Sequence, residues 1–178
     1  MIDERLGVDV VIEHELHAIH LGESFKIDDL LQLNNTTQLW LITTADNLRF
    51  AHMIFDVLCT GEMTILVTEG ADRTTSAANL TPLNRRRVGT PSDAEVTVGR
   101  GATGGSTNGA TVIKNLRIGA TDKFSALAGD APGRREYVLK PNTKYVVSVT
   151  TYTDVHVTLR LHWCEHADRR QQDYFNVE

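Results

Sequence analysis

The strongest constraint on the fold is an alternation of apolar and polar residues near the end of the chain, in residues 155–165 (VHVTLRLHWCE). Successive side chains of a β-strand point to opposite faces of the sheet, so residues two apart share a face. One face carries the apolar set Val157, Leu159, Leu161 and Trp163, and the other carries His156, Thr158, Arg160, His162 and Cys164. The pattern predicts a half-buried strand, with one face in a core and the other facing solvent or a partner.

Further strand-like segments recur along the chain and are rich in the β-branched and aromatic residues that suit a pleated surface. They are residues 8–20, 37–44, 50–58, 63–69, 112–118 and 144–153. Turn residues separate several of them, at 60–62, at 140–143 and at Thr153-Asp154, where we expect a short hairpin turn. Residues 26–33 fit a helical turn that is too short to change the fold class.

Residues 70–90, 99–110 and 120–135 have the composition of loops. Residues 99–110 contain five glycines and almost nothing apolar, which predicts an exposed hairpin tip or flexible excursion outside the core. Short strands joined by turns and long loops predict an all-β, two-sheet β-sandwich, jelly-roll-like, with a closed barrel as the competing architecture. The length fits one domain over residues 1–178, with an N-terminal arm at residues 1–12.

The net charge of −5 is unevenly distributed along the chain. Residues 1–84 carry four Lys/Arg and thirteen Asp/Glu, a net charge of −9, whereas residues 85–178 carry fourteen and ten, a net charge of +4. Such asymmetry favours contacts between copies or docking onto a charged lattice, although solvated faces can also differ by chance. An acidic chain is a poor candidate for binding nucleic acid, so no nucleic-acid partner is expected.

The cysteine count and the N-terminal sequence bear on the compartment. Cys59 and Cys164 lie far apart and form no C-x-x-C pair, so free thiols are expected, although a disulfide stays an open alternative. The first residues lack the basic segment and apolar run of a signal peptide, and no stretch has the length of a membrane-spanning helix. These features predict a soluble protein that is not exported and has no membrane partner.

Histidines suggest a metal site, but the spacing does not support one. His14, His17 and His20 are three apart, which is not the H-E-x-x-H arrangement of zincin proteases, and the strand interpretation directs the first two to opposite faces. A cupin-like site would need at least three of the seven histidines to converge from several strands. We therefore expect no metal, no cofactor and no catalytic residue.

Other candidate groups also favour a structural role. Cys164 alternates with His162 and His166, and side chains two apart on a strand lie about 7 Å apart, too far for a thiol–imidazole hydrogen bond. The glycine-rich segment has no G-K-S/T ending and matches no phosphate-binding loop. The residues expected to contact a partner protein or another subunit are Arg85, Arg86, Arg87, His156, Arg160 and His162. The residues expected in the core are Trp40, Leu159, Leu161 and Trp163.

Several segments, in their order, resemble parts of the head-stabilising proteins of tailed bacteriophages. These are residues 14–25 running into GESF, residues 40–44 followed by the FAHM of 50–53, and Glu69-Gly70 followed by Asn84-Arg85-Arg86. The ending, residues 137–145 (YVLKPNTKY) through 161–166 (LHWCEH), is similar to a proline-bearing turn, a Thr-x-Tyr strand and an aromatic-x-Glu-His close. Cys164 departs from the aromatic residue expected at that position.

The resemblance to the decoration, or cement, protein family implies a non-enzymatic virion component. Such a protein would be assembled in the host cytoplasm and would coat the capsid surface, binding the major capsid protein and its own copies, often as a trimer. Two alternatives remain open from the residues. A β-sandwich module that binds carbohydrate or another ligand would need aromatic side chains on a concave sheet, and a cupin-type metal-binding protein would need converging histidines.

Overall fold

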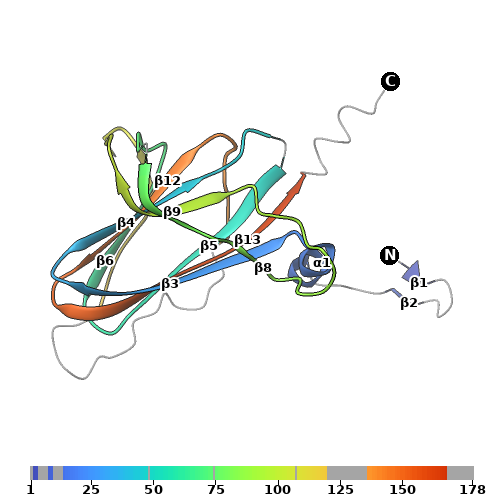
Figure 1. Cartoon of the computed structure of the whole chain (residues 1–178), viewed down its shortest axis with the longest axis horizontal. Helices are drawn as coiled ribbons and strands as arrows, with labels where there is room; N and C mark the ends of the chain where they lie inside the picture. The colour runs from blue at the N-terminus through green and yellow to red at the C-terminus, as the bar shows by residue number, and fades with distance from the viewer. Residues whose placement is uncertain are drawn as a thin grey trace.

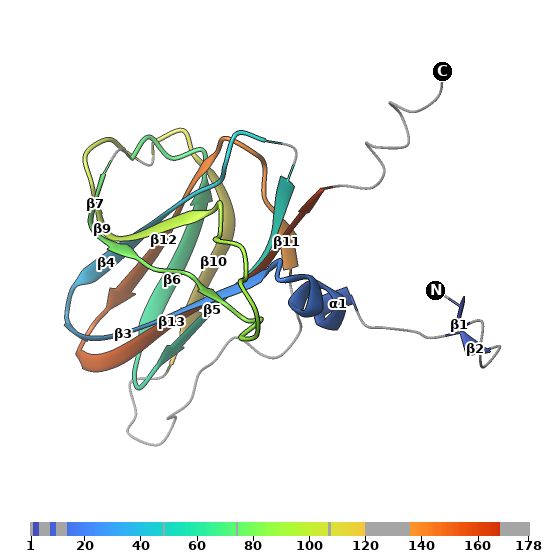
Figure 2. The ribbon, with the colours of Figure 1, turned by 45° about the vertical axis from the view of Figure 1, so that its right-hand side comes forward.

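Two antiparallel sheets pack face to face and make a β-sandwich (Figure 1 and, turned by 45°, Figure 2). The computed structural model describes residues 2–3, 8–9, 14–47, 49–73, 75–106, 108–119 and 136–167. The predicted all-β, two-sheet sandwich is confirmed, and the barrel alternative is not found. Residues 120–135, which the sequence analysis assigned to a loop, lie outside the described residues.

Six strands form one sheet and five form the other. In spatial order, the six-stranded sheet consists of β10 (Thr111–Ile118), β6 (Met63–Glu69), β12 (Lys144–Thr151), β4 (Thr37–Thr43), β9 (Thr97–Thr103) and β7 (Thr75–Leu80). The five-stranded sheet consists of β11 (Glu136–Val138), β5 (Arg49–Cys59), β13 (Asp154–Ala167), β3 (Ser24–Asn34) and β8 (Leu83–Asn84). Apart from these sheets, β1 (Ile2–Asp3) pairs with β2 (Val8–Asp9), and α1 (His14–Leu21) precedes β3.

The strand connections follow a jelly roll. From β3 to β6 and again from β12 to β13, each strand lies in the sheet opposite to that of the strand before it. The first and last strands of the sandwich, β3 and β13, pair with each other, and so do the next pair inward, β4 and β12. The resulting four-stranded units, β3–β13–β5–β11 and β4–β12–β6–β10, have the strand order of two interlocked Greek keys.

The predicted hairpin at Thr153-Asp154 is therefore wrong. The turn links β12 to β13, which lie in different sheets, and the turn at 60–62 links β5 to β6 in the same way. The two turns pack against each other: a Cβ placed on Gly61 would lie 2.6 Å from Cγ1 of Val155. A short turn has the same residue preferences whether it closes a hairpin or crosses between sheets, so the local sequence does not distinguish them.

The middle of the chain is an insertion between β6 and β10 that extends both sheets. Residues 70–90, predicted as a loop, contain β7 and β8. Residues 99–110, predicted to lie outside the core, include most of β9, and both Val98 and Ala102 of that strand are buried. The backbone of Gly105 packs directly against the backbone of Asp72. The φ of Gly105 is +53°, and a Cβ added to it would lie 1.2 Å from the carbonyl oxygen of Asp72. The glycines here allow close packing as well as conformational freedom.

Two predictions in the N-terminal region are wrong. Residues 14–21 form α1 instead of continuing a strand, and the helix ends in a Schellman motif. Gly22 has φ +78° and donates its N–H to Ile19 O at 3.1 Å, while Glu23 donates to Ala18 O at 2.9 Å. Residues 26–33, predicted as a helical turn, lie in the eleven-residue strand β3, because eleven consecutive pairs with β13 outweigh a weak local helical preference.

The inner faces of both sheets form the main core. Trp40, Leu159, Leu161 and Trp163 are buried there, as the alternation predicts. Cys164, which the pattern assigned to the polar face, is also buried. Burial of this outward residue has a local cause, since Ser24 lies directly opposite it on β3 and α1 packs beside the same end of β3. The end of β13 is thus covered on both faces.

Candidate functional site: the outer face and open edge of the five-stranded sheet

Two buried carboxylates hold the insertion against the sandwich. Glu165 accepts hydrogen bonds from the indole N–H of Trp163 at 2.8 Å and from the backbone N–H groups of Glu95 and Val96 at 2.9 and 3.0 Å. Because these donors engage both carboxylate oxygens, Glu165 serves to order the chain before β9. This role of Glu165 was not predicted, since the sequence around a glutamate on an alternating strand does not indicate its buried partners.

Asp29 makes the corresponding link on the other side of the insertion. It accepts a hydrogen bond of 2.7 Å from the indole N–H of Trp40 on β4, and its second oxygen pairs with Arg100 of β9 at 3.0 Å. A carboxylate on the five-stranded sheet thereby binds two strands of the opposite sheet. Both tryptophans of the chain are thus buried and anchored from within, so neither provides an exposed platform for a ligand.

The outer face of the five-stranded sheet carries a row of charged side chains. Arg160 on β13 lies opposite Asp28 on β3 and Asp56 on β5, with nitrogen–oxygen separations of 3.7 Å to each carboxylate. Asp28 also pairs with Lys26 at 2.8 Å, which lowers the pKa of the Asp28 carboxyl from its usual value. Charges on this face are therefore matched within the sheet, leaving a polar surface without a large field of one sign.

His162 lies next to this row on the same face. It is half-buried, opposite Lys26 on β3 and Ile54 on β5. Burial lowers the pKa of the imidazole, and the nearby positive charges of Arg160 and Arg85 lower it further. The lowered pKa favours the neutral imidazole, which can donate and accept a hydrogen bond at a contact.

The structure brings together half of the predicted contact residues. Arg85 reaches the same end of the sheet, where it pairs with Glu15 of α1 at 2.6 Å, so Arg85, Arg160 and His162 share one region. His156 is exposed near the opposite end of β13, and Arg86 and Arg87 follow β8 in the chain, where Arg86 is half-buried and Arg87 exposed.

A pair of histidines lies at the β5 side of this face. The rings of His52 and His166 are tilted against each other with centroids 4.4 Å apart, and His52 Nδ1 lies 3.5 Å from a Glu136 carboxylate oxygen.

Burial raises the pKa of the Cys164 thiol, and Cys59 is also a free, buried thiol with a raised pKa, so neither has the character of an activated nucleophile. Among the residues that the structure describes, no group of three or more His, Cys, Asp or Glu is placed to hold a metal ion.

Among the residues that the structure describes, strand β3 has an open edge. On one side it pairs with β13 along its whole length, but on the other side the described part of the chain pairs with it only through β8, at Phe25 and Lys26. Backbone groups of a strand alternate between its two edges. Glu23 O and Asn35 N bond toward β13, so the odd-numbered residues face β13 and the even-numbered residues face the other edge. Four residues beyond β8 therefore direct both N–H and C=O to the open edge: Asp28, Leu30, Gln32 and Asn34.

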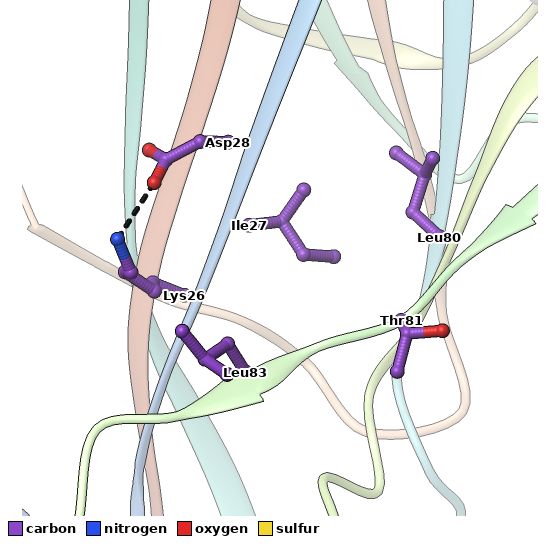
Figure 3. Close-up of a pocket in the computed structure, with 6 residues that line it drawn as sticks. All are labelled: Lys26, Ile27, Asp28, Leu80, Thr81 and Leu83. Atoms are coloured by element: carbon purple, nitrogen blue, oxygen red, sulfur yellow. Dashed lines mark hydrogen bonds and ion pairs between the residues drawn. The ribbon is translucent and has the colours of Figure 1, made fainter.

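A groove runs beside the start of this edge. It has a volume of about 270 Å³ and lies between β3 and the segment that joins β7 to β8 (Figure 3). Ile27 and Leu80 point toward each other across it, and Leu83 closes one end (Figure 3). The groove is apolar at its base, while the Lys26–Asp28 ion pair lies at its outer side (Figure 3). Neither the groove nor the edge was predicted from the sequence, although the apolar residues Phe25, Ile27, Leu31 and Leu33 repeat with period two.

Comparison of the chain with protein-family models, with curated proteins and with solved structures gives no match. Among the described residues, no helix has the length and apolar character needed to cross a membrane.

Proposed function

We propose that this chain is a structural virion protein that coats and stabilises a bacteriophage capsid by binding the major capsid protein and its own copies, without catalysis. The jelly-roll strand order supports this proposal, because that architecture recurs in viral capsid domains as well as in lectins and cupins. The open edge of β3 is the observation that carries it.

Open strand edges invite pairing with another chain, and natural proteins usually protect them with short strands, bulges, lysines or prolines. Two other edge strands of this sandwich have such protection: β11 has three residues, and β10 has a register shift between Val112 and Lys114. The open part of β3 pairs with β13 in continuous register and contains no Lys or Pro between Asp28 and Asn34. The side chain of Leu30 in its middle is 64% exposed. An edge of this kind suits an extended strand contributed by a neighbouring subunit.

The neighbouring polar face would complete the contact. A strand added at β3 continues the outer face past Asp28, and a partner can then reach Arg160 and His162 in the next strand. An edge of one subunit that binds a different segment of the next makes a heterologous contact, which closes into rings such as the trimer that the resemblance implies. Main-chain hydrogen bonds provide the affinity in this arrangement, and side chains in the groove provide selectivity.

Hydrogen exchange of individual amides tests this proposal. In dilute protein, the amides of Leu30 and Gln32 should exchange rapidly, whereas that of Leu31, which bonds to β13, should be protected. Raising the concentration until copies associate, measured by sedimentation, should protect Leu30 and Gln32 selectively. Association that leaves both amides unprotected would exclude the β3 edge as the contact.

A matched pair of variants extends the test. Leu30→Lys places a protective lysine on the open edge and should weaken association at least tenfold, because it opposes strand addition. Val88→Lys introduces a lysine at another exposed apolar residue, one that lies in the segment after β8, and should leave association unchanged. Equal effects of the two variants would show that general surface hydrophobicity, not strand pairing, drives association.

A further inference from the structure

The turn between β9 and β10 contains the Asn108-Gly109 dipeptide, where asparagine precedes glycine for the only time in the sequence. Asn108 is exposed, and its backbone N–H donates to Ser106 Oγ at 2.9 Å. Gly109 has φ +78°, and an added Cβ would meet nothing within 4 Å. The Cα of Gly109 therefore has open space beside it, and no side chain of that residue hinders its peptide nitrogen.

Two other asparagines of the insertion, Asn79 and Asn84, are held more firmly. The Asn84 side chain is buried, and its amide nitrogen donates to Gly22 O at 2.7 Å and to Ser92 O at 2.9 Å. Its side-chain oxygen accepts a 2.9 Å hydrogen bond from Arg86 N. Asn79 lies within β7 and precedes Leu80, whose branched side chain hinders the peptide nitrogen. Asn108 is thus distinguished by its neighbour, because it is exposed and no other asparagine in the sequence precedes a glycine.

We propose that Asn108 is a site of spontaneous modification, converting to aspartate and isoaspartate in the folded protein. The Gly109 nitrogen attacks Cγ of Asn108, forming an N–Cγ bond and a five-membered succinimide while the side-chain amine leaves as ammonia with the proton from Gly109. Water then opens the ring at either carbonyl and yields aspartate or isoaspartate. No oxidation or reduction takes place, and water is the one co-reactant.

Conversion changes the surface above the six-stranded sheet. The turn is anchored where Asp72 and Ser106 exchange backbone hydrogen bonds of 2.9 Å, and Ala110 packs on a small outer cluster around Val146. Aspartate adds a negative charge at the exposed tip, and isoaspartate also lengthens the backbone there. The anchors lie on both sides of Asn108, so we expect the sandwich to remain intact after conversion. The protein should then become a mixture of molecules that differ in net charge.

The test uses the intact protein aged at mildly alkaline pH and then digested with trypsin. Cleavage after Arg100 and Lys114 releases a peptide, residues 101–114, in which Asn108 is the one asparagine. That peptide should gain about one dalton and resolve into two product forms, one of them a substrate for isoaspartyl methylation. Residues 74–85 provide an internal control that contains Asn79 and Asn84 and should stay unchanged.

Asn108→Gln is the matched variant, since its longer side chain disfavours the five-membered ring. It should remain a single charge form during ageing and keep the melting temperature of the parent protein. Equal conversion of the control peptide would overturn the proposal, and so would conversion that occurs in urea but not in the folded protein. Continued charge heterogeneity in Asn108→Gln would place the reaction at another residue.

Discussion

Replacing Trp163 with alanine should be among the most destabilising single changes in the chain. Its side chain is 2% exposed, and its ring stacks on Phe25 with centroids 5.7 Å apart. Truncating a buried tryptophan removes a large apolar surface and leaves a cavity, which typically costs about 3–5 kcal/mol. The change also removes one of the three hydrogen bonds to Glu165, which places the expected loss in the upper half of that range.

Equilibrium unfolding in urea measures this loss, and Trp40 remains as the fluorescent reporter. Trp163→Phe is the matched control, because it retains most of the ring contact and loses the indole N–H, and it should cost about 1–3 kcal/mol. His162→Ala, on the opposite face of the same strand, should cost about 0.5 kcal/mol in the isolated protein. A loss below about 1 kcal/mol for Trp163→Ala would refute the view that β13 anchors the core. The same holds if His162→Ala is the more damaging variant.

Two further predictions follow from individual contacts. Burial raises the pKa of the Tyr145 hydroxyl to about 12, and the charge of Glu69 contributes to this rise. The stabilising effect of the protonated hydroxyl is therefore fully present below about pH 10 and is lost as the pH rises through about 12. As the pH is raised through about 12, Tyr145→Phe should lose about 2–3 kcal/mol less of its free energy of unfolding than the parent protein, as measured by thermal melts. Equal losses in the two proteins would contradict the raised pKa of Tyr145. Gly105→Ala places a Cβ against the Asp72 carbonyl and should lower stability by more than 2 kcal/mol. Gly109→Ala, at a positive φ with open space around it, should lower the free energy of unfolding in urea by about 1 kcal/mol. Equal losses in Gly105→Ala and Gly109→Ala would show that the backbone at Asp72 moves aside at little cost.

The structure also reverses an expectation about the glycine-rich segment. Its composition suggests that residues 99–110 can be removed without effect on the thermal midpoint. Because β9 lies between β4 and β7 and Arg100 binds Asp29, we expect deletion to destabilise the sandwich substantially. Glycine content is a poor guide where close backbone packing, not mobility, is the reason for the glycine.

The sequence alone determines much of the secondary structure. Strands β4, β5, β6, β10, β12 and β13 fall close to their predicted segments. Period-two alternation is a local property, since each strand must present one face to a core whatever strand lies beside it. The same reasoning placed Leu159 and Leu161 on the inner face and Arg160 and His162 on the outer face.

Tertiary structure decided which strands pair, and with that the candidate site. Pairing β3 with β13 joins segments more than a hundred residues apart, and no pattern within either segment specifies that partner. The open edge of β3 exists because β8 stops after two residues, and the region around His162 forms because Arg85 arrives from the insertion. Long-range contacts of this kind depend on how the sheets fit together, so neither the edge nor the buried roles of Asp29 and Glu165 can be inferred from local alternation.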